Sequence, residues 1–172
     1  MIVFIPMAEG QHIKREVYQS INSQTLKAEM RFCVTPGAVR SHRNYSKLRR
    51  NVESASRSKA REYAVWCTDV DYIVMQDYDR EHLRNDNFEA MKRFLESHPT
   101  FGAVSVSGVR NPHNKHHIDI GCVMYRYDVY TRLDFTNKYG RCLCKEVTEQ
   151  IRSIGLEFDY LDNIVRTKEI TK

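Results

Sequence analysis

The sequence lacks the long apolar stretch that a membrane-spanning helix requires. Its opening residues, 1–6, also lack the basic segment and the small-residue cleavage site of a signal peptide, and are typical of a first strand. The five cysteines are odd in number and widely scattered, which favours reduced thiols in a cytoplasmic protein over a disulfide frame. With 172 residues, 41% of them hydrophobic, and no linker-like segment, we expect one domain over residues 1–172.

Several kinds of site are also missing. No glycine-rich phosphate loop follows the first strand, which argues against a nucleotidyltransferase. Cys142 and Cys144 could begin a zinc site, but no second pair stands at a suitable spacing. Three histidines lie close together in the segment 110–117, namely His113, His116 and His117. They form either a basic loop or the source of one metal ligand or base, and both readings stay open.

A moderate excess of positive charge is present. The net charge is +5 and the isoelectric point is about 9.0, which suits a sugar nucleotide, a nucleic acid or an anionic membrane surface as partner. The excess is concentrated in residues 40–61, where eight lysines and arginines stand against the single acid Glu53. This stretch could track nucleic-acid phosphates, attract a diphosphate, or form a solvated helix face.

Apolar runs and helical patterns alternate along the chain. The expected strands are 2–5, 30–34, 72–76, 101–106, 118–125 and 156–161. The expected helices are 11–24, 46–65, 86–97 and 146–154. We expect Pro6 to stop the first strand, and Asp86 to cap a helix with Glu89 as its capping-box partner. This order predicts an α/β protein, with a mostly parallel sheet covered by helices on both faces.

Two acids follow the buried run 72–76. Asp77 and Asp79 stand two residues apart, and in extended geometry such residues point to the same side. Two carboxylates at a strand end can hold a hard divalent cation, and that cation can hold a diphosphate. In open α/β sheets, ligands bind at the carboxyl ends of the strands. The alternative is that these acids simply begin a polar loop.

Short motifs in a fixed order give this pattern a family resemblance. They are Val3–Pro6 followed by Glu9, Ser20-Ile21-x-x-Gln24, Asn51 to Ala64 with Ala60-Arg61, Asp71 to Asp79, Asn87 to Val104, and Ile120-Gly121 followed by Arg126 to Val129. Their order resembles the GT-A glycosyltransferases, in particular the inverting group called family two, and covers most of the chain.

The resemblance implies a nucleoside-diphosphate sugar as donor, with a UDP- or GDP-sugar expected, and a divalent Mn²⁺ or Mg²⁺. It implies Asp79 as metal ligand, and Asp77 as a catalytic carboxylate that contacts the donor directly or through the metal. The implied donor-binding residues are Pro6, Glu9, Lys59, Arg61, Asp77 and Tyr78. A solvated helix face is the alternative for Lys59 and Arg61.

The sequence departs from the family at two places. Residues 34–37 stand where the family has an aspartate pair, one of which reads the nucleobase. The family's general base would fall on Leu143 or Cys144, and Glu146 is the nearest carboxylate. An inverting transfer needs a base that reaches the acceptor hydroxyl. Glu146 takes this role, another acid does, or activity is lost; the alternative for Glu146 is an exposed acid favoured by the helix dipole.

The sequence therefore predicts a metal-dependent glycosyltransferase, inverting by resemblance, with an unknown acceptor. One alternative is the same fold acting on nucleic acid, for example on a modified DNA base, because of the basic stretch 40–61. Another is a degenerate, non-catalytic module that binds a nucleotide or a protein, because the aspartate pair is missing and the base is displaced.

Overall fold

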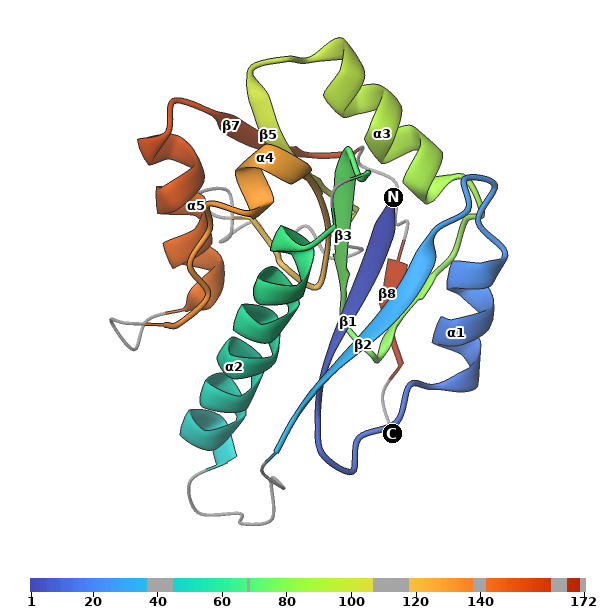
Figure 1. Cartoon of the computed structure of the whole chain (residues 1–172). Coiled ribbons are helices and arrows are strands. Elements are labelled where there is room, and N and C mark those ends of the chain that lie inside the picture. The colour runs from blue at the N-terminus through green and yellow to red at the C-terminus, as the bar shows by residue number, and fades with distance from the viewer. Residues whose placement is uncertain (37–44, 68, 107–117, 138–141, 162–166, 171–172) are drawn as a thin grey trace.

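The computed structural model describes residues 1–36, 45–67, 69–106, 118–137, 142–161 and 167–170. A six-stranded sheet with the order β2-β1-β3-β6-β5-β7 forms its centre (Figure 1). Its strands are β1 (Ile2–Ala8), β2 (Glu29–Thr35), β3 (Tyr72–Gln76), β5 (Phe101–Ser105), β6 (Cys122–Arg126) and β7 (Glu157–Tyr160).

The sheet is mixed but mostly parallel. Strand β1 pairs in parallel with both β2 and β3, and β5 pairs in parallel with β7. Strand β6 runs antiparallel to its neighbours β3 and β5. The expected α/β fold with a mostly parallel sheet is confirmed, and the carboxyl ends of β1, β2 and β3 meet at one edge.

Helices cover both faces of the sheet, as the sequence predicted. They are α1 (Arg15–Asn22), α2 (Tyr45–Val65), α3 (Asn87–Ser97), α4 (Tyr127–Tyr130) and α5 (Leu143–Ser153). One core lies between the sheet and α2, α4 and α5, and the other lies between the sheet and α1 and α3. Within the described residues, no helix combines the length and the apolar character needed to cross a membrane.

Two local signals in the sequence misled us. Strand β1 continues through Pro6 to Ala8, because beyond Phe4 it has no partner on its β3 side and a missing N–H costs nothing there. Asp86 makes no side-chain cap to α3, because Arg84 holds its carboxylate with two bonds of 2.8 and 2.9 Å. The Gln24 side chain instead accepts the Phe88 N–H at 3.2 Å.

Several boundaries also differ from expectation. Helix α1 begins at Arg15 instead of residue 11, and α5 begins at Leu143 instead of Glu146. Strand β6 begins at Cys122 instead of residue 118, because the residues before it turn toward β3. The histidine-bearing segment 110–117 and the start of the basic stretch, 40–44, lie outside the described residues.

A second, two-stranded sheet was not expected from the sequence. Strand β4 (Arg80–His82) follows directly after the Asp77-Tyr78-Asp79 segment and pairs antiparallel with β8 (Thr167–Glu169). The Ile170 N–H donates to the Asp79 carbonyl at 2.8 Å, and the Lys14 ammonium donates to the Ile170 carbonyl. The last described residues of the chain therefore pack beside the acidic segment and bond to its backbone.

A buried histidine lies at the end of β4. His82 is 5% exposed, and its ring meets the edge of the Phe88 ring with centroids 4.9 Å apart. The Asn87 amide nitrogen lies 2.8 Å from Nδ1 and can only donate, so Nδ1 accepts and the imidazole is neutral. Burial lowers the pKa of His82 to about 3.

We expect this histidine to make folding stability depend on pH. Because the folded-state pKa lies below the unfolded-state value, the stabilisation is complete above about pH 6.5 and is lost as the pH falls toward 3. The His82 contribution to the free energy of unfolding should fall by about 2 kcal/mol between pH 7 and pH 5. Urea unfolding at several pH values measures it.

His82→Gln should remove this dependence, because glutamine does not titrate and can still accept from Asn87. His98→Gln is the matched control at an exposed position, and its pH profile should follow the wild type. Identical pH profiles for the wild type and His82→Gln would contradict the assignment.

Candidate functional site

The acidic motif lies in a tight turn at the carboxyl end of β3. The Arg80 N–H donates to the Asp77 carbonyl at 3.2 Å, which closes the turn 77–80. The fully buried Gln76 amide donates to the Arg80 carbonyl and, at 3.4 Å, to the Asp77 carbonyl. The expectation that Asp77 and Asp79 project from the same side of an extended strand is therefore wrong, because the chain turns immediately after Gln76.

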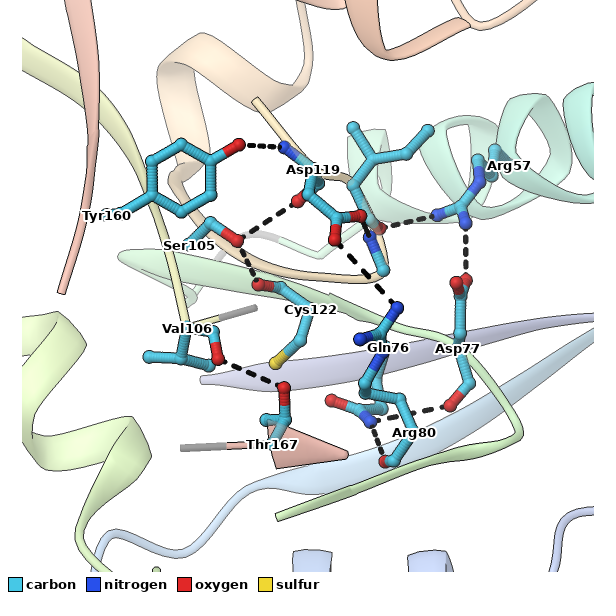
Figure 2. Close-up of polar contacts among 12 residues, drawn as sticks. Arg57, Gln76, Asp77, Arg80, Ser105, Val106, Asp119, Cys122, Tyr160 and Thr167 are labelled. Carbon is cyan, nitrogen blue, oxygen red and sulfur yellow. Dashed lines mark hydrogen bonds and ion pairs between the residues drawn. The ribbon is translucent and has the colours of Figure 1, made fainter. Parts of the chain in front are cut away.

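An ion pair between a buried arginine and a partly exposed aspartate joins α2 to this turn. Arg57 Nη2 lies 2.5 Å from Asp77 Oδ1, and Arg57 Nη1 donates to the Ile120 carbonyl at 3.3 Å (Figure 2). The Arg57 side chain is 4% exposed and that of Asp77 is 29% exposed. A guanidinium withdrawn from water this far needs a charged or strongly polar partner, and Asp77 supplies it.

A second pair of opposite charges lies beside the first. Arg80 Nη2 is 3.8 Å from Asp119 Oδ2. Gly121 lies between the pairs: a Cβ atom there would stand 3.0 Å from both Arg80 Nη2 and Asp77 Oδ2, and 3.2 Å from Asp119 Oδ1. Only a residue without a side chain lets two aspartates and an arginine converge this closely. We call Arg57, Asp77, Arg80 and Asp119 the charge cluster.

The backbone around Asp119 is fixed from several elements. The Asp119 N–H donates to the Tyr160 hydroxyl at 2.7 Å, and the Ser105 hydroxyl donates to the Asp119 carbonyl at 3.0 Å (Figure 2). The Gly121 N–H donates to the Asp119 carboxylate, and the Asp77 N–H donates to the Gly121 carbonyl at 2.8 Å. The charge cluster is thus held by β3, β5, β7 and the turn that precedes β6.

The residues predicted on the donor side divide into two groups. Pro6 lies in β1 and Glu9 follows it, so both lie at the same edge of the sheet as Asp77. Tyr78 packs partly buried against the core on the α1 and α3 side. Among the described residues, the positively charged side chain that contacts Asp77 is Arg57.

Lys59 and Arg61 have other contacts. Lys59 Nζ donates to the Val34 carbonyl at 3.1 Å and lies 5.8 Å from the centroid of the Tyr63 ring. Arg61 donates through Nε and Nη2 to the Thr131 carbonyl at 3.0 and 2.7 Å. Both side chains are half-buried and tie α2 to neighbouring segments.

Glu146 lies in the first turn of α5 and is only 6% exposed. The alternative of an exposed acid at that position is therefore wrong. Helix α5 is anchored beside the charge cluster, because Thr148 accepts the Ile118 N–H at 2.8 Å. The hydrogen bond of Cys144 to Cys142 and the burial of Cys144 raise the pKa of this thiol well above the ordinary value.

Sequence reasoning missed Arg57, Arg80 and Asp119. Arg57 had a detectable signal, because it stands three and seven residues before Ala60 and Ala64 and so shares the buried stripe of α2. Arg80 and Asp119 gave no comparable signal, because their meeting depends on the turn after β3 and on Gly121.

A divalent cation fits this site only in part. Mg²⁺ is commonly held by one or two carboxylates together with substrate phosphates. Asp79 belongs to that ligand class, whereas the Asp77 carboxylate already binds Arg57. Over the described ranges, no group of three or more His, Cys, Asp or Glu side chains could hold a metal ion by itself. The residues present therefore suit a cation that a bound diphosphate helps to hold.

Comparisons with known proteins place the fold. No protein-family model and no curated protein matches this sequence. The protein A197 from STIV matches with a TM-score of 0.64 and 8% identity, over 100% of this chain and 87% of its own. A mannosyltransferase from Pyrobaculum calidifontis, in complex with GDP-Man and Mn²⁺, matches with a TM-score of 0.67 and 16% identity. The match covers 99% of this chain and 57% of the mannosyltransferase.

A third structure is a Drosophila beta-1,4-galactosyltransferase 7 mutant in complex with manganese, UDP-Gal and xylobiose. It matches with a TM-score of 0.57 and 17% identity, over 99% of this chain and 70% of its own. At these identities the matches establish the fold alone. The chain has a fold of the GT-A glycosyltransferase type, as its sequence motifs predicted.

We expect Asp77 to be required for folding as well as for any chemistry. Asp77→Ala would leave Arg57 buried without its carboxylate, which should lower the free energy of unfolding by about 3–5 kcal/mol. The double variant Arg57→Met with Asp77→Leu should recover much of that loss, because it removes both charges. Chemical denaturation of the wild type, Asp77→Ala and the double variant measures the recovery, and a double variant no more stable than Asp77→Ala would contradict the expectation.

Gly121→Ala should disturb the charge cluster. The new methyl group would press on Arg80 and Asp77, and we expect a loss of about 1–3 kcal/mol in unfolding free energy. Gly102→Ala is the control, because its Cβ would meet the apolar side chains of Leu156 and Val129 at 3.1–3.3 Å and would press on no charged group. A loss at Gly121→Ala no larger than at Gly102→Ala would argue against tight packing of the charges.

Proposed function

We propose that this chain is a glycosyltransferase that transfers a sugar, with inversion, from a nucleoside-diphosphate sugar to an acceptor. The observation that carries the proposal is the Asp77-Tyr78-Asp79 turn at the carboxyl end of β3, in a sheet of the GT-A type. Ligands of open α/β sheets bind at this edge. The acceptor of the sugar is left open.

The donor class is supported by the structural neighbours. The mannosyltransferase was solved with GDP-Man and Mn²⁺, and the galactosyltransferase with UDP-Gal and manganese. We therefore propose a UDP- or GDP-sugar as donor and Mn²⁺ or Mg²⁺ as the cation. No aspartate ends β2, so this chain must read the nucleobase by other contacts than the family's aspartate.

Each acid at the site has a separate proposed role. Arg57 holds Asp77 in place at the end of β3, so that Asp77 can contact the donor from a fixed position. Asp79 is the carboxylate offered to the cation. When bound, a divalent cation supplies Lewis-acid stabilisation of the negative charge that develops on the departing diphosphate. Pro6, Glu9 and Tyr78 remain proposed donor contacts at the same edge, and Lys59 and Arg61 more distant ones.

The proposed general base is Glu146, which would take the proton from the acceptor hydroxyl as the new glycosidic bond forms. Its burial in the first turn of α5 would hold the carboxylate away from bulk water. Asp119 is the second candidate, because its carboxylate belongs to the charge cluster and its backbone is anchored from Ser105 and Tyr160.

A nucleic-acid acceptor has less support. Of the basic stretch, Arg57, Lys59 and Arg61 each bond to other parts of this chain, which leaves less of their charge for a phosphate backbone. The side chains of the remaining lysines and arginines of that stretch lie outside the described part of the structure.

Nucleotide binding tests the proposed function. UDP, GDP and their sugars should be screened for an increase in melting temperature, each with and without Mn²⁺. We expect one nucleotide to stabilise the protein, and Mn²⁺ to increase that stabilisation, because Asp79 and the diphosphate would share the cation. Asp79→Asn should abolish the gain from Mn²⁺ while leaving the fold intact.

Asp71→Asn is the matched control, because Asp71 is exposed and precedes the opposite end of β3. It should respond to nucleotide and Mn²⁺ as the wild type does. Binding of a nucleotide without any turnover of its sugar would favour a non-catalytic module. No stabilisation by any nucleotide, with or without Mn²⁺, would refute the donor site.

A further inference from the structure

Arg80 is buried at the centre of the site with its hydrogen-bonding capacity unfilled. The Arg80 side chain is 11% exposed. Its Nη2 atom lies 3.8 Å from Asp119 Oδ2, which is longer than a hydrogen bond. Its Nε atom is buried and has no hydrogen-bond partner among the described residues. Because an ionised donor withdrawn from water is costly to leave unmatched, this guanidinium is suited to receive an anion.

The two arginines of the charge cluster differ in the contacts of their terminal nitrogens. Arg57 is engaged by the protein, with a carboxylate at 2.5 Å and a backbone carbonyl at 3.3 Å. Among the residues that the structure describes, the Arg80 guanidinium has the long contact to Asp119 and no other charged partner. The cluster as a whole holds two cations and two anions, so its aspartates do not present an uncompensated negative charge that only a metal ion could neutralise.

Arg80 lies in the acidic turn, where the proposed function puts the donor diphosphate. The residue closes the turn that contains Asp77 and Asp79, and its Nη2 atom would lie 3.0 Å from a Cβ atom at Gly121, which has no side chain. A guanidinium presents paired N–H donors that match phosphate oxygens, and its charge does not depend on pH. A diphosphate bound beside Asp79 would therefore meet Arg80 directly.

We propose that Arg80 binds the diphosphate of the sugar nucleotide, so that the nucleotide binds this chain without a divalent cation and the cation only strengthens a site that already exists. This inference rests on the proposed function, since it concerns the same donor site. It assigns to Arg80 part of the charge stabilisation that the family resemblance gives to the metal alone.

The test is nucleotide binding in the absence of metal. UDP and GDP are titrated by calorimetry into the full chain in EDTA, and again with Mn²⁺. The nucleotide that binds the wild type with Mn²⁺ should still bind it in EDTA. Arg80→Gln should weaken binding in EDTA by about 10- to 100-fold, the loss expected when a charged hydrogen-bond donor is removed.

Two further variants test whether the effect comes from the paired N–H donors of the Arg80 guanidinium. Arg84→Gln is the control, because Arg84 is exposed on the same segment and pairs with Asp86, and it should bind as the wild type does. Arg80→Lys keeps the charge without the paired donors and should fall between the wild type and Arg80→Gln. It also serves as the test if Arg80→Gln folds poorly, which unfolding of the nucleotide-free proteins would reveal.

The outcomes separate this inference from the proposed function. Binding that requires Mn²⁺ and vanishes in EDTA would overturn the role of Arg80 and leave the donor site standing. Equal binding in EDTA by the wild type, Arg80→Gln and Arg80→Lys would do the same. No binding of either nucleotide under either condition would overturn both proposals.

Discussion

The ion pair between Arg57 and Asp77 is the constraint on which the rest of the site depends. It places a guanidinium from α2 against the end of β3, and the same guanidinium holds the Ile120 carbonyl of the turn before β6. A buried cation of this kind fixes its partners, because any arrangement that separated them would leave a charge in a medium that solvates it poorly. Gly121 then becomes necessary, since the second pair of charges must fit into the space that remains.

Much of the sheet could be predicted, because local pattern decides it. The strand 72–76 has an unbroken buried run, and the helix over 45–65 carries small residues at helical spacing, so both were found nearly in full. The errors arose where a distant group overrides a local signal. Gln24 caps α3 in place of Asp86, and the absence of a strand partner beside Pro6 lets β1 continue.

The sequence points to the acids of the candidate site but not to their pairing with arginines. Asp77 and Asp79 were recognised from their place after a buried strand. Their geometry was not, because the turn depends on the Gln76 amide and on the Gly121 carbonyl, which comes from a distant part of the sequence. The sequence suggested Lys59 and Arg61 as the cations near the motif. The cation that contacts Asp77 is instead Arg57, on the buried face of the helix. Tertiary packing decides which side of a helix is buried. In α2 the signal for that side in the sequence is the spacing of its small residues.

The pairing of β4 with β8 has a consequence for the order of events during synthesis. The turn with Asp79 is completed by a strand near residue 170, so the contact between them spans about half of the chain. While the ribosome still holds that strand, the nascent protein can build β1, β2 and β3 but cannot close this contact. Contacts of such long sequence separation form late, because the loop entropy must be overcome first. A folding molecule would therefore pair β1, β2 and β3 before the contact between Ile170 and the acidic turn closes.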